Sequence, residues 1–386
     1  IGARTYQIDP TWSKVLTVMD YSITLFFVVE ISIRFWAEDN KRDFFKSGWN
    51  IFDSLIVLIS IIPLSGGDMA LLGRLIVESP QGVQEIFVDE RDVASDSDAS
   101  ALDGGFLWDV PPEVMVPGAS FAVEIAEADP AIEHDTIEGA PRVPADGVET
   151  LGVQPGRHEL EIVVVPLQYS GGGTVIQPDL SETNRRILED ALYDQNPVDS
   201  LKISYRSVVA YPDPIRSGNE LSNVLGYLSS LKSQDGAGSQ VYYLGLVDVG
   251  CFVAGCGNGG TTGVGFIPSA QEFSSNQRVS ISIWYQPESS SGTAVHELGH
   301  NQGLNHVACP GAFSSGTDPA YPHEDGRAGV WGYGLRSGEV SGSSSYDYMS
   351  YCGPSWASDW TWNKTRERIT TLSEWSAQAS QSQSPA

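Results

Sequence analysis

The beginning of the chain contains two long runs of apolar residues. They cover residues 15–36 and 51–64, and a polar stretch at residues 37–50 separates them. A helix that crosses a bilayer needs about 20 mostly apolar residues. The first run is long enough, and the second is long enough if Trp49 and the residues after Pro63 contribute. The pattern predicts a transmembrane helical hairpin within residues 1–76.

Residues 77–157 have a different pattern, in which short apolar stretches alternate with Pro, Gly and acidic residues. Residues 106–108 and 120–125 are two such stretches. Short alternating segments between turn-forming residues are typical of the strands of a β-sandwich. We therefore expect a small, acidic β-sandwich-like module in this part of the chain.

From residue 158 onward, strand-like and helix-like patterns alternate. Strands are predicted at residues 159–165, 201–210, 241–247, 263–267 and 279–285, and helices at residues 181–193, 220–231 and 362–375. This order predicts a mixed α/β domain over residues 158–375, so the chain as a whole is expected to be α+β. The last segment, residues 376–386, consists of Ser, Gln, Ala and Pro and is expected to be disordered.

The charge of the chain limits its partners. The sequence has 22 Lys and Arg against 49 Asp and Glu, a formal net charge of −27. Because an acidic chain is repelled by nucleic-acid phosphates, we expect no nucleic-acid partner. The charge is concentrated in residues 77–150, which carry two basic and eighteen acidic residues, whereas residues 1–76 carry seven basic and eight acidic ones. This change indicates a domain boundary near residue 76.

One histidine-rich segment carries the clearest chemistry. His296 and His300 are four residues apart and so share one face of a helix, where both imidazoles can bind one metal ion. Glu297 lies beside them in the same cleft. Gly303 can take the left-handed conformation that ends the helix, which lets His306 approach as a third ligand. Three neutral histidines leave the fourth zinc position open, as in catalytic rather than structural sites.

This pattern resembles the long zinc-binding motif of the metzincin clan of zinc metallopeptidases. The resemblance extends over residues 158–375 and is closest to secreted bacterial members. It implies that Met349 forms an apolar floor under the zinc, in the methionine turn of the clan. It also implies that Tyr351 contacts the metal or the oxyanion, as in astacin-like and serralysin-like members. Val307 differs from the residue that those subfamilies have after the third histidine.

These residue types predict zinc-dependent hydrolysis of peptide bonds. Zinc lowers the pKa of bound water to about 7 and polarises the carbonyl, while Glu297 takes the proton and returns it to the leaving amine. A protein or peptide substrate is expected to add a strand to the sheet edge through backbone hydrogen bonds. The edge residues expected for this are Gly263, Val264, Gly265, Phe266 and Ile267.

The cysteines indicate an oxidising compartment. All four lie late in the chain, and their even number predicts two disulfides. Their spacing favours Cys251 with Cys256, which leaves Cys309 with Cys352. A zinc site made of these four is the alternative, but no two of them have the two-residue spacing of structural zinc knuckles.

The loop between the two predicted membrane helices sets their orientation. It contains Lys41, Arg42 and Lys46, which the positive-inside rule assigns to the cytoplasm. Everything after residue 76 is then expected outside the cytoplasm, secreted or on the cell surface. The hairpin itself is expected in the inner or plasma membrane.

The predicted hairpin contains charged residues, which are costly in a membrane unless they have a partner or a function. Phe27 and Glu30 lie about one helical turn apart, and Asp53 follows at the start of the next helix. This combination resembles the second and third helices of a voltage-sensor domain of the ion-channel family. The resemblance implies that the ring and the two carboxylates form the station past which arginines of a fourth helix move. Arg74 has no basic neighbours at the spacing of such a helix, so an ordinary membrane hairpin is the alternative.

Three hypotheses for the function are open at this point. The first is an extracytoplasmic zinc endopeptidase attached to the membrane by its hairpin. The second is an ion-channel or voltage-sensing protein that carries an outer domain, and the third is an inactive metal-binding adhesion protein. The chain begins with Ile1, so we expect a fragment or a processed piece. The junction near residues 76–80 is equally explained by a functional fusion or by an artefact that joins two unrelated genes.

Overall fold

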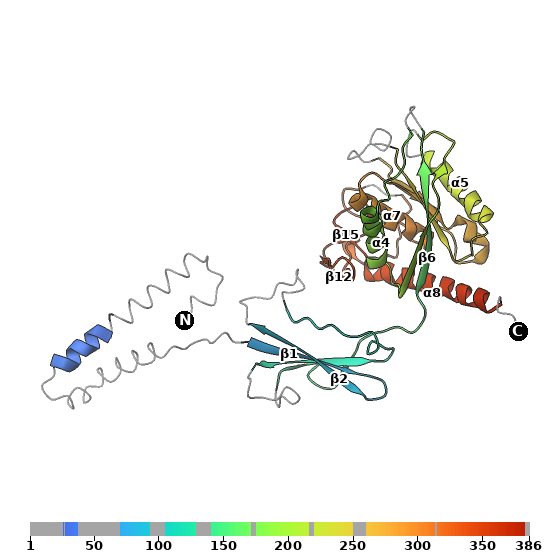
Figure 1. The fold of residues 1–386 in the computed structure, drawn as a ribbon. Coiled ribbons are helices and arrows are strands. Elements are labelled where there is room, and N and C mark those ends of the chain that lie inside the picture. Colours follow the sequence, from blue (N-terminus) through green and yellow to red (C-terminus); the bar gives the residue numbers. More distant parts are fainter. Residues whose placement is uncertain are drawn as a thin grey trace. The chain divides into compact units, whose positions relative to one another are not determined.

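The computed structural model describes residues 26, 28–37, 70–92, 105–128, 140–170, 175–215, 220–249, 260–312 and 315–382 (Figure 1). The chain divides into two compact units, Ile1–Gln154 and Pro155–Ala386. We treat each unit by itself.

The first unit contains an antiparallel sheet. Its strands are β1 (Ala70–Glu78), β2 (Gln84–Asp92), β3 (Ser120–Glu127), β4 (Arg142–Val143) and β5 (Glu149–Thr150). The order is β2-β1-β3-β4, and β5 also pairs with β3. The turn between β1 and β2 includes Gly82, whose positive φ of 77° favours a residue without a side chain. β1 is thus bonded along both of its edges.

One face of this sheet is covered by an irregular segment rather than by a second sheet. Leu75 and Val77 of β1 form a small core with Val114, and Trp108 packs against it. Pro111 and Pro112 lie in the covering segment, and prolines cannot donate the hydrogen bonds of a strand ladder. For the described residues of this unit, the predicted β-sandwich is therefore wrong, because they form one sheet with an irregular cover.

β1 also crosses the predicted boundary at residue 76. Arg74 lies in the middle of β1, is only 3% exposed, and donates a hydrogen bond of 2.7 Å to Glu124 on β3. Residues 70–76 are consequently part of the sheet, and the predicted change of domain falls inside a strand. An arginine that is buried against a carboxylate of a sheet does not belong to a voltage-sensing fourth helix.

The predicted hairpin lies mostly outside the described residues. Residues 28–37 are helical, and Glu30 pairs with Arg34 one turn later. Phe27, Asp53 and the whole second predicted helix are not among the described residues. In the part of the chain that the structure does describe, no helix combines the length and the apolarity that a membrane crossing requires.

The second unit is built on a mixed sheet. Its strands are β6 (Glu159–Gln168), β7 (Ser200–Tyr205), β8 (Val209–Ala210), β9 (Tyr242–Val247), β10 (Gly263–Gly265) and β11 (Val279–Ile283). The order is β10-β11-β9-β6-β7, with β8 paired to β6 beyond the end of β7. The pairs within β11-β9-β6-β7 are parallel, whereas β10 is antiparallel to β11 and forms an edge. The predicted α+β class is consistent with these two units.

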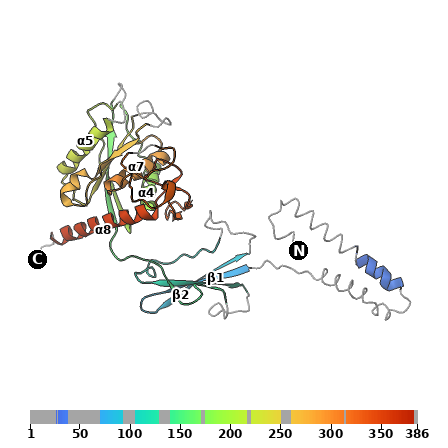
Figure 2. The same ribbon diagram turned by 180° about the vertical axis from the view of Figure 1, so that it is seen from behind.

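Alternation along the strands produces two separate cores. In β6, Leu160, Ile162 and Val164 belong to one apolar cluster, while Val165 and Leu167 belong to the other. Successive side chains of a strand point to opposite faces, so the sheet is covered on both sides. The helices α4 (Glu182–Asp194), α7 (Pro287–Asn301) and α8 (Asp359–Ser382) contribute to the first cluster, and α5 (Leu221–Gln234) contributes to the second. Figure 2 shows α5 on the opposite side of β6 from α4 and α7.

The remaining elements are short. A 3-10 turn, η5 (Glu272–Gln277), precedes β11, and a second one, η6 (Glu324–Gly326), follows α7. β12 (Gly332–Tyr333) pairs with β13 (Val340–Ser341) as a hairpin, and β14 (Tyr346–Asp347) pairs in parallel with β15 (Ser355–Trp356). All of these elements except η5 lie between α7 and α8 in the chain.

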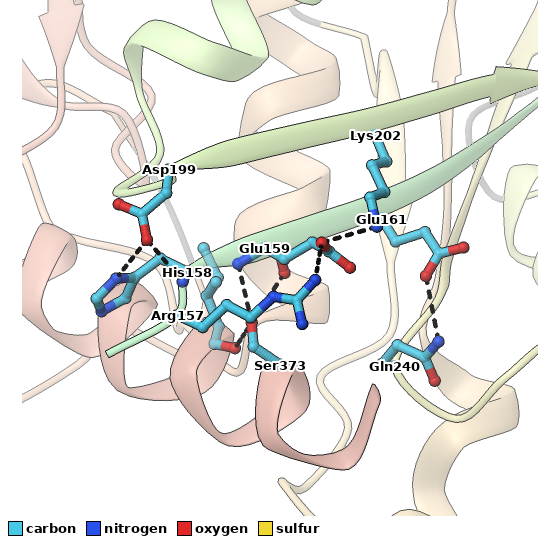
Figure 3. Close-up of polar contacts among 9 residues, drawn as sticks. Arg157, His158, Glu159, Glu161, Asp199, Lys202, Gln240 and Ser373 are labelled. Atoms are coloured by element: carbon cyan, nitrogen blue, oxygen red, sulfur yellow. Dashed lines mark hydrogen bonds and ion pairs between the residues drawn. The ribbon is translucent and has the colours of Figure 1, made fainter. Parts of the chain in front are cut away.

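α8 is anchored to the beginning of β6 (Figure 3). Ser373 of α8 accepts a hydrogen bond of 2.9 Å from the backbone N–H of Glu159. The Glu159 carboxylate is 2.9 Å from Arg157 and 2.7 Å from Lys202, so this buried charge is paired on two sides. α8 continues to Ser382, seven residues into the segment that was predicted to be disordered. Ala and Gln are good helix formers, which explains the extension of the helix.

Candidate active site

α7 carries three of the predicted functional residues. Pro287 is its first residue, where the missing N–H costs no hydrogen bond. His296, Glu297 and His300 are 8%, 6% and 5% exposed. The other β11 residues pack in the same apolar cluster as α5, and Ser280 and Ser282 point to the opposite side of the sheet. Their small side chains allow α7 to lie close to the strand. The helix is thus a buried support for the two histidines.

The chain turns back at Gly303, as predicted. Gly303 has a φ of 92°, and a Cβ at this position would lie 2.4 Å from the guanidinium of Arg368 on α8. Arg368 donates hydrogen bonds to the carbonyls of Asn301 at 3.4 Å and Pro268 at 3.2 Å. A cation at the C-terminal end of a helix is favoured by the helix dipole. Arg368 therefore fixes both the end of α7 and the loop that follows β10.

The third histidine is held by a loop. His306 forms a β-bridge with Thr317, and its carbonyl accepts a hydrogen bond of 2.8 Å from the N–H of Asp318. Asp318 is in turn bound by Lys364 of α8 at 2.6 Å. His306 is brought to the other two histidines, since nitrogen atoms of all three rings lie within 4.8 Å of one another.

Each of the three rings is oriented by a backbone carbonyl. Nδ1 of His296 donates to Tyr348 at 2.8 Å, Nδ1 of His300 donates to Leu304 at 2.9 Å, and Nδ1 of His306 donates to the carbonyl of residue 315 at 2.7 Å. A carbonyl oxygen only accepts, so each neutral ring carries its proton on Nδ1. Nε2 of each ring is therefore unprotonated and can act as a ligand. Such outer hydrogen bonds are a regular feature of histidines that bind metals.

The ring geometry fits a divalent cation. Nε2 of His300 and Nε2 of His306 are 3.1 Å apart, although both are unprotonated acceptors. Two lone pairs at this separation repel each other unless a positive charge lies near both. A tetrahedral zinc ion with Zn–N distances of 2.0–2.1 Å separates its nitrogen ligands by about 3.3 Å, which is close to the spacing here.

Burial keeps the two helical histidines neutral. Burial and the neighbouring His300 lower the pKa of His296 to about 3. Burial also lowers the pKa of His300 to about 4. Metal binding requires the unprotonated ring. Both histidines are consequently ready to bind a metal at neutral pH without first losing a proton.

Glu297 lies between the triad and the edge strand. A Cβ on Gly263 of β10 would lie 2.7 Å from Oε1 of Glu297, so this glycine leaves the space that the carboxylate needs. Gly265 similarly leaves space for the backbone of α7, because a Cβ there would lie 2.6 Å from the Glu297 carbonyl. Burial raises the pKa of Glu297 to about 8. A nearby cation favours the charged carboxylate and opposes this shift.

Met349 packs beneath the helix. It is fully buried, and its Sδ would be 2.5 Å from a Cβ on Gly299, which lies between the two helical histidines. The backbone of Met349 accepts a hydrogen bond from Val307, directly after the third histidine. Asp347 fixes this turn by accepting hydrogen bonds from the N–H groups of Met349 at 2.8 Å and Ser358 at 3.1 Å.

Tyr351 reaches the triad from the same turn. Its hydroxyl donates to Nε2 of His306 at 2.9 Å, and its ring stacks on His296 with centroids 5.6 Å apart. The side chain is 55% exposed, so it lines the open side of the triad. Burial of its inner part, followed by the charge of Glu297, raises the pKa of Tyr351.

One of the two predicted disulfides is present. Cys309 and Cys352 are bonded, with Cα atoms 6.3 Å apart, and join the loop after His306 to the segment after Tyr351. This pairing is confirmed. Cys251 and Cys256 lie outside the described residues, so the other disulfide stays a prediction.

Three supporting residues were not predicted. Asp347 had a signal in the sequence, since it stands two residues before Met349. Arg368 had none, because it contacts Asn301 across a separation of 67 residues. Asn301, the last residue of α7, donates hydrogen bonds of 2.9 Å to the carbonyls of Phe266 and Val279. It ties the helix to the end of the β10–β11 pair.

Comparison with known proteins yields two family matches. Residues 226–307 match the model described as metallo-peptidase family M12B Reprolysin-like. Residues 3–82 match the model described as ion transport protein. The first match includes all three histidines and ends one residue after His306, before the methionine turn. No curated protein matches the chain.

Two solved structures are similar to parts of the chain. Metalloproteinase-II from Bacteroides fragilis has 19% identity and a TM-score of 0.30, with 55% of this chain and 53% of that chain covered. A structure described as a chaperone-substrate complex has 14% identity and a TM-score of 0.30, with 57% of this chain and 35% of that chain covered. The chain therefore spans about half or less of the length of these two structures.

Proposed function

We propose that this protein is a zinc-dependent endopeptidase that acts outside the cytoplasm. One observation carries the proposal. Three imidazoles whose Nδ1 atoms bind backbone carbonyls each place a ring nitrogen within 4.8 Å of those of the other two, beside a buried glutamate. The match of residues 226–307 to a reprolysin-like peptidase model supports the same activity.

The residues of the site have separate roles in this proposal. His296, His300 and His306 would hold zinc, which when bound lowers the pKa of a water molecule and polarises a peptide carbonyl. Glu297 accepts the proton of that water and delivers it to the leaving amine. Tyr351 donates a hydrogen bond from the open side of the triad, and Met349 supports α7 from below.

β10 is suited to hold an extended peptide. Thr262 accepts a hydrogen bond from Ile283, and Phe266 donates one to Val279, so these residues point their polar groups at β11. In an antiparallel pair the direction alternates, which turns the N–H and C=O groups of Gly263 and Gly265 toward the open edge. A substrate strand bonded to Gly263 would lie next to Glu297.

Localisation outside the cytoplasm is supported by the Cys309–Cys352 disulfide, because such bonds persist in oxidising compartments. The expected attachment to a membrane depends on residues outside the described part of the chain. Labelling of free thiols in intact and permeabilised cells tests the location. A protein whose Cys309 and Cys352 are found reduced in the producing cell would contradict it.

The activity is tested with the full chain and a fluorescein-labelled casein. We expect cleavage that a zinc chelator abolishes and that added zinc restores. Glu297→Gln should lower kcat by about 10²–10⁴-fold, the range of general acid–base catalysis, while the zinc content stays at one ion per chain. Zinc binding without cleavage of casein or other unfolded proteins would favour the inactive adhesion protein instead.

A second candidate follows from the match of residues 3–82 to the ion transport model. A voltage-sensing role needs a fourth helix with several arginines, and Arg74 is committed to the sheet of the first unit. The role would therefore depend on arginines supplied by another chain. Gating currents from membranes that contain this protein would support the candidate. Their absence would leave the peptidase function as the remaining hypothesis.

A further inference from the structure

A cavity of about 460 Å³ lies beside α7, away from the edge strand. Its walls come from the second half of α4, the first half of α7, the β12–β13 hairpin and β15. The lining residues that matter here are Asp190, Asp194, Glu288, Gly292, Glu339 and Trp356. The volume is within the range of about 300–1,000 Å³ that is typical of ligand pockets.

The cavity and the histidine triad share α7, which lines the one with its first half and carries two histidines of the other in its second half. Gly292, which lines the cavity, precedes His296 by four residues, so the two positions are neighbours one turn apart on the helix surface. Four residues advance a helix by about 6 Å. The cavity therefore begins about one turn before His296, which is within the reach of a side chain of a substrate bound at the triad.

A second wall is bonded to the same site. The carbonyl of Trp356 accepts a hydrogen bond of 2.9 Å from the N–H of Tyr348. The carbonyl of Tyr348 in turn orients His296. Two independent walls thus connect the cavity to the first histidine, one through α7 and one through β15.

The lining carries an excess of negative charge. Asp194 is buried and accepts hydrogen bonds from two backbone N–H groups, those of Arg336 at 2.8 Å and Ser337 at 3.0 Å. Asp190 faces the guanidinium of Arg336 at 3.6 Å. Glu288 and Glu339 have no ion-pair partner within the ranges that the structure describes. Four carboxylates therefore face one cation, and that cation already stacks on Tyr193.

The rest of the lining is partly polar, with Gln195 and three serines, and partly apolar. Ile187 and Ala191 of α4 form one wall, and the indole of Trp356 forms another. A long aliphatic stem with a charged end matches such a surface, because the stem covers apolar walls while the head reaches the carboxylates. Among protein side chains, those of lysine and arginine have this form.

We propose that the cavity receives a lysine or arginine side chain of the substrate, next to the bond that is cleaved. This selectivity rests on the proposed peptidase function. Glu288 and Glu339 at the rim are the specificity-determining residues, since their charges are otherwise unpaired. Substrates with an acidic residue at the same position would be rejected by the like charges.

The first test maps the cleavage sites. A set of unfolded proteins is digested with the zinc-loaded full chain, and the new ends are identified by mass spectrometry. Lysine and arginine should be enriched at one fixed position adjacent to the cleaved bonds, and aspartate and glutamate should be depleted there. Cleavage without such an enrichment overturns this proposal and leaves the peptidase function in place.

The second test assigns the selectivity to the cavity. Quenched fluorescent peptides differ only at the enriched position, where they carry arginine or its neutral analogue citrulline. The variant with Glu288→Gln and Glu339→Gln should reduce the preference for arginine over citrulline by at least tenfold in kcat/KM, about 1.4 kcal/mol. Glu367→Gln on the exposed face of α8 is the matched control and should leave the preference unchanged.

The outcomes separate the two hypotheses. An equal loss of kcat/KM for the arginine and citrulline peptides in the double glutamine variant would contradict a role of the two carboxylates in substrate selectivity. A gain of activity on glutamate-containing peptides in Glu288→Lys would support that role directly. If the wild-type chain cleaves no substrate at any zinc concentration, the proposed function fails, and the selectivity fails with it.

Discussion

The triad is assembled from two regions of different construction. His296 and His300 belong to α7, where helical spacing alone puts both rings on one face, and both are buried. His306 and Tyr351 belong to irregular segments held by Asp318, Asp347 and a disulfide. The helical region is fixed by local geometry, whereas the loop region is fixed by contacts between distant parts of the chain. Their stability should therefore respond differently to substitution.

Removal of the disulfide should have the largest effect on the loop region. Cys309 and Cys352 are 43 residues apart, and closing a loop of this length in the unfolded chain stabilises the fold by about 4 kcal/mol. The double variant with both cysteines replaced by serine should lose this amount in urea unfolding followed by tryptophan fluorescence. A loss below about 1 kcal/mol would mean that other contacts already order the loop region.

Asp347→Ala should cause the next largest loss in the free energy of unfolding. The substitution leaves the N–H groups of Met349 and Ser358 buried without their acceptor, at about 1–3 kcal/mol each. Because the neighbouring carbonyl of Tyr348 orients His296, zinc affinity should also fall by about 10–100-fold. Asp199→Ala is the control, since that carboxylate is 66% exposed and pairs with His158, next to the start of β6. Equal effects of the two substitutions on zinc affinity would contradict a specific role of Asp347.

Gly263→Ala tests the helical region, because Gly263 of β10 lies next to Glu297 of α7. The new methyl group would meet the side chain of Glu297 at 2.6–2.7 Å and that of Thr293 at 2.8 Å, and should displace the carboxylate. A misplacement of about 1 Å can lower kcat by about 10²-fold. Zinc content, measured by atomic absorption, should not change. Gly226→Ala in α5 is the control, because nothing lies within 4 Å of its added methyl group.

Tyr351→Phe should have the smallest effect on metal binding. The hydroxyl competes with the metal for Nε2 of His306, and an exposed hydrogen bond of this kind contributes about 0.5–1.5 kcal/mol. Zinc affinity should therefore rise by about two- to tenfold in competition titrations with a chromophoric chelator. A decrease in affinity would show that Tyr351 helps to bind the metal rather than competing for its ligand.

The same difference explains which parts were predictable from the sequence. α4, α5, β6 and β9 were predicted close to their observed bounds, because periodic burial marks each of them locally. The predicted strand over residues 201–210 is split into β7 and β8, since three exposed or half-buried residues, 206–208, interrupt it. The order of the strands in the sheet was not predicted. It depends on which distant segments pair, and no local pattern contains that information.

For the site, the sequence motif identified the residues that carry the chemistry but not the residues that hold them in position. Spacing and residue type were sufficient for His296, Glu297, His300 and His306. Gly303 was predicted from the need for a left-handed turn, and it has one. Arg368 and Asn301 act through backbone carbonyls of other elements, so their identity gives no hint of their role. Residues that bind backbone groups leave no spacing pattern that a reader of the sequence could use.

The path of β1 has a practical consequence for dividing this protein into parts. β1 runs from Ala70 to Glu78 and pairs with β2 on one side and β3 on the other. An expression fragment that starts at residue 77 would lack seven of its nine residues and would expose two strand edges to aggregation. A fragment that starts before Ala70 would keep all of β1, and residue 70 lies within the stretch that matches the ion transport model.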